Sequence, residues 1–236
     1  MSFSKDVACI IAEYLAKYKL LDWIDINRLD WRILSANPNA IELLKDNQDK
    51  IDWFWISENA SAIELIEANL DKISWHWLAS NPAAIDLLNA NPGKIEWYWL
   101  SMNPAAMGRL IDNPDKIHWE TLSRNSAAIE LISNNLNKID WSLLSENSAA
   151  IELLKSNQDK INWHWLSRNP AALELLMSHP DSIDWHEFSL NPVAIDFLLA
   201  HPDKIYWPWL SRNPAIFAPK IDPILVERLL EVPSLN

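Results

Sequence analysis

The chain has 236 residues, 49% of them apolar, and a formal net charge of −12. This apolar content supplies a continuous core, while the acidic balance argues against nucleic acid or an anionic membrane surface as the partner. The only cysteine is Cys9, which excludes an intrachain disulfide and is typical of a reducing compartment.

Residues 1–28 are expected to form a helical cap, because their apolar residues recur at helical spacing without the motif that governs the rest of the chain. Asp6 and Glu13 interrupt this apolar stretch, which argues against a secretory signal. No stretch is apolar for long enough to predict a transmembrane helix. We therefore expect a soluble intracellular protein.

From residue 29 to 217 a tryptophan recurs every 22 residues without insertion or deletion. A fixed period of this length is typical of repeat architectures, in which each unit packs only on its neighbours. Positions in each unit are counted from this tryptophan as zero. The periodic tryptophans are Trp31, Trp53, Trp75, Trp97, Trp119, Trp141, Trp163, Trp185 and Trp207.

The second half of each unit is predicted to be a helix, because its apolar residues at +9, +10, +12 and +13 share one helical face. Position +6 is Asn in all nine units and +7 is Pro in six, the pattern of an N-cap followed by proline in the first turn. Asn or His at +16 suits a left-handed helix stop. In the first unit this helix would run from Pro38 to about Asp46.

The first half is predicted to be a shorter helix, capped at +21 and stapled by pairs such as Ile51 and Ile56. The alternating apolar residues around Trp55 also fit a strand-containing solenoid, but Thr121 and Glu187 break that alternation at +2. We favour the helical interpretation. It gives an all-α solenoid of nine 22-residue helix–turn–helix units, a curved rod on the order of 80 Å long.

The motif decays after residue 217, and residues 218–236 are expected to form a second helical cap with a helix from Pro223 to Glu231. The predicted organisation is therefore a cap at 1–28, a solenoid at 29–217 and a cap at 218–236.

The unit is written most completely from Lys72 to Leu88 and from Asp203 to Pro214. It resembles the tandem 22-residue Trp/Asn-Pro repeat of large DNA viruses of the mimivirus and phycodnavirus kind. The resemblance implies a viral origin, a role in infection or in the particle, and a location in the cytoplasm of the infected host or in the virion. It brings no catalytic residues. The sequence departs from the motif at Asn59-Ala60, at Asn125-Ser126 and Asn147-Ser148, and at Gly108 and Arg109, which replace the usual acid and leucine.

No residue pattern predicts an enzyme, a cofactor or a metal. His76, His164 and His186 share position +1 of separate units, too far apart to hold one zinc ion. His179 and His201 replace the asparagine at +16 and are expected to do its work.

Three further positions recur around the units. The asparagines at +6 are predicted to stack as a ladder and to tie down the turn between the helices. Acidic residues at +11 and lysines at +19 would form two solvated stripes that pair with one another, or a charged strip that steers a partner. Position +5 varies, and Arg124, Arg168 and Arg212 there are interpreted as plain surface with a basic rim.

Positions +1 and +2 carry the candidate binding site, because aromatic residues gather there in only some units. The +2 tryptophans are either exposed for a partner or packed under the neighbouring unit, and the polar Thr121 and Glu187 at the same position favour exposure. The candidate partner-binding residues are Phe54, Trp55, His76, Trp77, Tyr98, Trp99, Trp165 and Trp209.

The sequence thus predicts a non-enzymatic protein–protein interaction scaffold that binds a host or viral protein of unknown identity. The alternative is a structural virion component, a minor capsid or core protein. A third hypothesis, nucleic acid or a small anionic ligand along the lysine row, conflicts with the net charge. The oligomeric state stays open.

Overall fold

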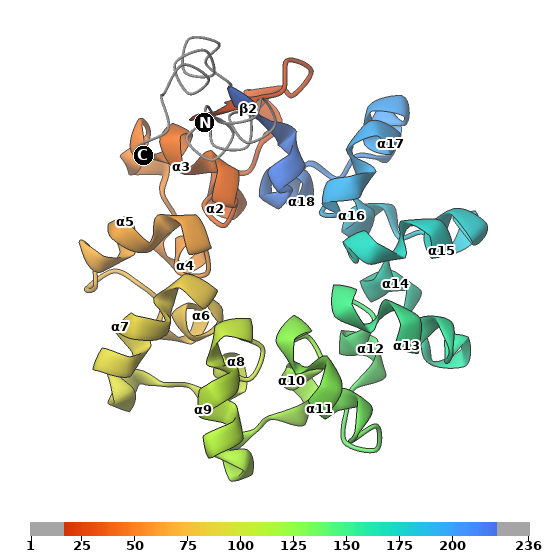
Figure 1. Cartoon of the computed structure of the whole chain (residues 1–236). Coiled ribbons are helices and arrows are strands. Elements are labelled where there is room, and N and C mark those ends of the chain that lie inside the picture. The colour runs from red at the N-terminus through yellow and green to blue at the C-terminus, as the bar shows by residue number, and fades with distance from the viewer. Residues whose placement is uncertain (1–16, 221–236) are drawn as a thin grey trace, which may run out of the picture.

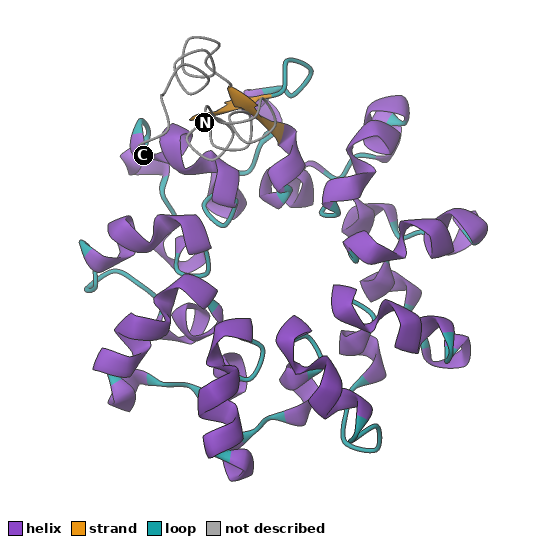
Figure 2. Cartoon of the chain, in the orientation of Figure 1, coloured by secondary structure: helices purple, strands orange, loops and turns teal. Residues whose placement is uncertain are grey.

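The computed structural model describes residues 17–220, which form nine helical units arranged as a closed ring (Figure 1). The first and last units lie side by side, so the predicted open rod is wrong. The prediction of an all-α repeat solenoid is confirmed, and in this chain the solenoid bends until its two ends meet (Figure 2).

Each unit begins with a short helix at the periodic tryptophan, and these first helices line the inside of the ring (Figure 1). They are α2 (Trp31–Leu34), α4 (Trp53–Ile56), α6 (Trp75–Ser80), α8 (Trp97–Leu100), α10 (Trp119–Leu122), α12 (Trp141–Leu144), α14 (Trp163–Leu166), α16 (Trp185–Phe188) and α18 (Trp207–Arg212).

The second helices lie on the outside of the ring (Figure 1). They are α3 (Ile41–Lys45), α5 (Ile63–Glu67), α7 (Ile85–Ala90), α9 (Met107–Asp112), α11 (Ile129–Ser133), α13 (Ile151–Lys155), α15 (Leu173–Ser178) and α17 (Ile195–Ala200).

Short 3-10 turns join these helices, and η1 (Ile26–Arg28) precedes the first unit. Before each second helix, and in the last unit before β2, lie η2 (Pro38–Ala40), η4 (Ala60–Ala62), η5 (Pro82–Ala84), η7 (Pro104–Ala106), η9 (Ser126–Ala128), η10 (Ser148–Ala150), η12 (Pro170–Ala172), η14 (Pro192–Ala194) and η16 (Pro214–Ile216). After six of the second helices lie η3 (Gln48–Lys50), η6 (Pro92–Lys94), η8 (Pro114–Lys116), η11 (Gln158–Lys160), η13 (Pro180–Ser182) and η15 (Pro202–Lys204).

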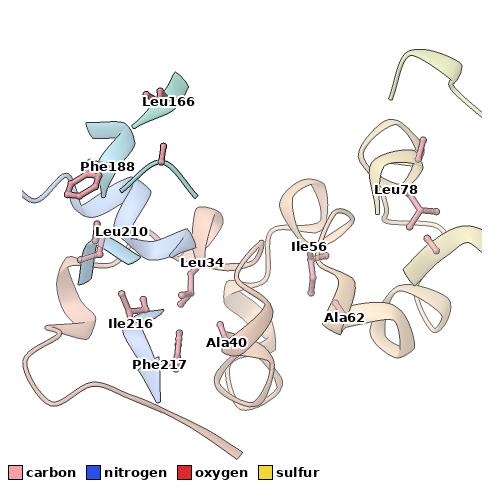
Figure 3. Close-up of a cluster of buried hydrophobic side chains, with 14 of the residues drawn as sticks. Leu34, Ala40, Ile56, Ala62, Leu78, Leu166, Phe188, Leu210, Ile216 and Phe217 are labelled. Carbon is pink, nitrogen blue, oxygen red and sulfur yellow. The ribbon is translucent and has the colours of Figure 1, made fainter. Parts of the chain in front are cut away.

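The core is built from three almost completely buried positions. Position +3 is leucine apart from Ile56 and Phe188, position +9 is alanine apart from Ile216 in the last unit, and position +13 is leucine or isoleucine in the first eight units. In the first unit these are Leu34, Ala40 and Leu44, each with no exposed surface. Figure 3 shows buried side chains at +3 and +9 in units on both sides of the junction between the last and first units, and they belong to one core cluster. None of the first helices is longer than six residues, so this shared core rather than helix propensity holds them in place.

The asparagine at +6 ties each unit to the one before it. The side-chain oxygen of Asn125 accepts a hydrogen bond from the backbone N–H of Ala127, which caps the 3-10 turn. The side-chain nitrogen donates to the carbonyls of Ser101 and Asn103 in the preceding unit, both at 3.0 Å. All nine asparagines repeat these three bonds, so the predicted cap and ladder are confirmed.

The second helices end without a left-handed residue, contrary to the prediction for position +16. No residue between 17 and 220 has a positive φ, and Asn47 has a φ of −134°. Its side-chain nitrogen instead donates to the carbonyl of Leu43 at 2.9 Å. His179 and His201 place Nδ1 against the equivalent carbonyls at 3.1 and 2.9 Å, as predicted for residues that replace this asparagine.

The seam between the last and first units repeats the internal contacts. Asn37 donates to the carbonyls of Ser211 and Asn213 at 3.0 and 2.9 Å, and the Asp30 N–H donates to Ser211 Oγ at 2.9 Å. Helix α18 packs on α2 here, as α6 packs on α8 inside the ring. The closed ring therefore has no unit with an uncovered end.

Two strands add a clasp across the seam. Strand β1 (Lys17–Leu20) pairs antiparallel with β2 (Phe217–Lys220), with Lys17 opposite Lys220. The segments predicted to form helical caps therefore contain these strands in the parts that the structure describes. Residues 1–16 and 221–236, with Cys9 and the predicted helix at 223–231, lie outside the described residues.

Closure at the seam can be tested by comparing two serine-to-alanine variants, one at the seam and one at a junction between internal units. Ser211→Ala removes the acceptor for the Asp30 N–H across the seam, and Ser145→Ala removes the equivalent acceptor for the Asn162 N–H inside the ring. In a closed ring both variants lose about 1 kcal/mol of unfolding free energy, and both amides exchange faster by a similar factor. An Asp30 amide that exchanges freely already in the unmodified protein would contradict closure.

One unit lacks this serine. Ala79 stands where eight units have a buried serine at +4, so no hydroxyl meets the N–H of Glu96. We expect Ala79→Ser to add this bond and raise the unfolding free energy by about 1 kcal/mol in denaturant titrations. The control Ala84→Ser buries a hydroxyl beside no such donor and should destabilise; a loss of stability in both variants would contradict the assignment.

Candidate interaction surface

The predicted site residues separate into two rows, because equivalent positions in a ring of repeats lie on one circle. Position +1 is mostly exposed, whereas position +2 is buried or half-buried. The predicted pairs, such as Phe54 with Trp55, therefore do not form one continuous exposed strip.

The +2 tryptophans of the second, third and fourth units stack on one another. The ring centroids of Trp55 and Trp77 are 5.7 Å apart at an interplanar angle of 28°. Those of Trp77 and Trp99 are 4.5 Å apart, and the two rings are tilted by 44°. All three side chains are half-buried, so each covers its neighbour rather than standing free in solvent.

The polar residues at +2 are buried, so the prediction that they mark an exposed position is wrong. Thr121 is 3% exposed and Glu187 is 5% exposed. The Thr121 hydroxyl donates to the carbonyl of Tyr98 at 2.6 Å, and the Glu187 carboxylate accepts from Arg168 Nε at 2.7 Å. The burial of these two polar groups costs little because each has a hydrogen-bond partner.

The two remaining predicted tryptophans lie apart from this stack. Trp165 is half-buried between two guanidinium groups, those of Arg124 at 5.1 Å and Arg168 at 4.5 Å from its centroid. Trp209 is half-buried too, 6.5 Å from the ring of Tyr206. The structure thus does not bring all five +2 tryptophans into one row of contacts.

Position +5 faces the inside of the ring, where it forms a charged cluster instead of the plain surface that was predicted. Arg168 Nη1 lies 3.2 Å from Glu146 Oε1, and Arg168 also pairs with Glu187. Arg124 Nη2 lies 2.7 Å from Glu146 Oε2. A row of four charges therefore joins units five to eight.

The same cluster continues across the seam. Arg212 of the last unit passes the first unit to reach Glu58 of the second, with Nη2 2.9 Å from Oε1. The Arg212 guanidinium also lies 5.7 Å from the ring centroid of Trp55. We call these six residues the inner cluster; its members are Arg124, Arg168, Arg212, Glu58, Glu146 and Glu187.

Glu58 is the most perturbed member of the inner cluster. Burial raises the pKa of its carboxyl above the usual range, and the positive charge of Arg212 opposes this only in part. Glu146 raises the pKa further and Arg124 lowers it, although both belong to units on another part of the ring. Charges of distant units thus act on one another through the inside of the ring.

Position +1 keeps an exposed row of rings. Phe54 is 49% exposed and Tyr98 is 38% exposed, and the His76 imidazole is also open to solvent. Residues at +21 extend this row between the units. We call the combined exposed rings the aromatic band, which comprises Phe54, His76, Tyr98, His118, His164, His186 and Tyr206.

Contacts within the structure hold the aromatic band in place. The rings of Phe54 and Tyr98 meet the tryptophan next in the chain edge-on, with centroids 5.7 and 5.3 Å apart. His164 Nδ1 lies 2.7 Å from Asp184 Oδ2. Partial burial raises the pKa of Asp184, but this bond and backbone N–H groups lower it by more, so the net pKa lies below the usual range. Rings braced in this way lose little further freedom on binding.

Five of the seven lysines at +19 lie over periodic tryptophans instead of forming a free charged strip. Lys50 Nζ lies 4.0 Å from the centroid of Trp31, and four other units repeat this contact at 4.5–4.9 Å. Such cation–π contacts contribute about 0.5–1 kcal/mol each at exposed sites. They leave fewer lysines free to bind an anionic partner.

Sequence reasoning missed the inner cluster and the band residues His118 and Tyr206. The alternation of Glu and Arg at +5 was visible, but only ring closure brings distant units within reach. Position +21 was considered solely as a helix cap, yet neither His118 nor Tyr206 makes a side-chain cap bond.

Between residues 17 and 220, no three His, Cys, Asp or Glu side chains gather as ligands of a metal ion would. None of the helices described is long and apolar enough to cross a membrane. Comparison with protein-family models, curated proteins and solved structures gives no match.

The raised pKa of Glu58 gives a pH prediction. A carboxyl whose pKa is higher in the folded state stabilises the fold below its unfolded pKa, and this contribution is lost as the pH rises through the folded value. Glu58→Gln removes the titration, so its stability relative to the unmodified protein should rise as the pH increases from about 4 to 8.

Urea unfolding at several pH values measures this difference, with Glu64→Gln at an exposed position as the control. A difference that stays flat or falls with increasing pH would mean that the pairing of Glu58 with Arg212 outweighs its burial.

Proposed function

We propose that this protein is a non-enzymatic, ring-shaped scaffold that binds a protein partner through the aromatic band. The observation that carries the proposal is the exposure of Phe54, Tyr98 and Tyr206, at 49%, 38% and 37%, in rows where every unit has an equivalent position. Large aromatic residues are costly to expose and are the usual anchors of protein interfaces.

The arrangement of the two rows supports this choice of surface. The half-buried Trp55, Trp77 and Trp99 form a stacked layer next to the exposed rings. An interface needs such a rigid base, because a partner then meets side chains that are already oriented. The tryptophans act as support, so the partner-binding role predicted for them passes mainly to position +1.

The viral assignment rests on the repeat resemblance. Under it, the partner is a protein of the host or of the virus, and the scaffold acts in the infected cell. A static place in the virion is the competing role, and purified particles that contain the protein in stoichiometric amounts would favour it.

The proposal is tested by Phe54→Ala with Tyr98→Ala in one chain. Quantitative mass spectrometry of cross-linked complexes from infected cells, or from cells that express the chain, compares this variant with the unmodified protein. We expect the bound partner to be depleted by at least about tenfold, since two interface anchors are removed. These positions are preferred to Trp77 and Trp99, whose removal would disturb the stack.

Leu199→Ala with Leu70→Ala is the matched control, because these residues are 49% and 41% exposed but lie outside the band. A partner that binds the band variant as well as the unmodified protein, or that is lost only from the control, would overturn the proposal.

A further inference from the structure

A groove lies between the third and fourth units, on the outside of the ring. It has a volume of about 470 Å³ and lies between α7 and α9, away from the aromatic band. Its residues are Ile85, Asn89, Trp97, Ala105, Gly108, Arg109, Asp112 and Asn113.

The equivalent groove between units six and seven has a volume of about 350 Å³, and an ion pair spans it. Lys155 Nζ lies 3.7 Å from Glu174 Oε2 across the two helices. In the larger groove the positions of this pair are taken by Asn89 and Gly108. The bridge is therefore absent, and the space of its carboxylate is open.

Both glycines of the chain lie in this region, and each stands where most other units carry an acidic residue. Gly108 replaces the acid that seven other units carry at +11, and Gly93 replaces the usual aspartate of the turn between α7 and α8. A side-chain carbon added at Gly108 would meet nothing within 4 Å. No packing or backbone constraint requires glycine there, so the absent acid is the main consequence.

Arg109 adds a positive charge where the other units have leucine or phenylalanine. Its guanidinium donates to Asn89 Oδ1, a neutral acceptor. Within residues 17–220 it has no carboxylate partner, unlike the three arginines of the inner cluster. An arginine can bind a carboxylate with two parallel hydrogen bonds, which an amide oxygen cannot match.

We propose that this groove binds the carboxylate of a ligand. Arg109 holds that carboxylate in the space that the acidic side chain at +11 occupies in other units. The half-buried Trp97 and Ile85 offer apolar contact to the carbon chain next to that carboxylate. Asp112 on the rim repels further negative charge, so the site selects a single carboxylate over phosphate or a polyanion. The carboxylate can come from an acidic residue of a peptide or from a small free acid.

The two glycines provide a direct assay, because glycine-selective 15N labelling gives one amide signal each from Gly93 and Gly108. The full chain is titrated with N-acetyl-Ala-Glu-Ala-amide, with its Gln counterpart and with the monocarboxylate butyrate, up to about 10 mM. We expect the Gly108 signal to shift with the Glu peptide or butyrate, with a dissociation constant on the order of 1 mM, and not with the Gln peptide.

Arg109→Leu restores the residue of the neighbouring units and should fold, and it should weaken the response of Gly108 at least about tenfold. Lys45→Leu removes one positive charge from another outer helix and should leave the response unchanged. A stronger response to the peptide identifies a protein segment as the ligand source, and a stronger response to butyrate identifies a free acid.

Three results would overturn the site: no shift of Gly108 with either carboxylate, an equal shift with the Gln peptide, or a response that survives Arg109→Leu. None of them bears on the aromatic band, so this site and the proposed function can fail separately.

Discussion

The buried asparagine at +6 is the interaction on which the ring depends. One amide group closes the turn of its own unit and satisfies two carbonyls of the unit before it, as Asn125 does for Ser101 and Asn103. Those carbonyls are buried and would be costly to leave without a partner. Every junction between neighbouring units has the same three bonds, so the units are held in one register. Identical steps from unit to unit then add up to a closed circle.

Closure gives the inside of the ring properties that no single unit has. Arg212 and Glu58 belong to units separated by the chain's two ends, yet they form an ion pair. The inner cluster contains three arginines and three glutamates, so it is close to neutral in a chain with a net charge of −12. The surplus negative charge therefore lies on the rest of the molecule. Charges inside the ring are tolerated because partners from several units converge there.

Much of the fold could be predicted from sequence because its causes are local. The Asn-Pro cap, the apolar face of the second helix and the histidines that replace Asn at +16 all act within one unit. The curvature could not be predicted, since it depends on a small rotation between units that leaves no mark in any one of them. The error over Thr121 and Glu187 has the same origin. A polar residue suggests solvent unless its partner is known, and the partner of Glu187 is Arg168 of the preceding unit.

The closed ring also constrains how this chain can change over evolutionary time. An open solenoid can gain or lose a unit by duplication or deletion, because each end simply moves by one step. Here a tenth unit would push Asn37 away from Ser211 and Asn213, and a ring of only eight units would crowd these residues. The number of repeats is thus set by closure, and the units of this chain differ from one another by substitution, as at Gly108 and Arg109.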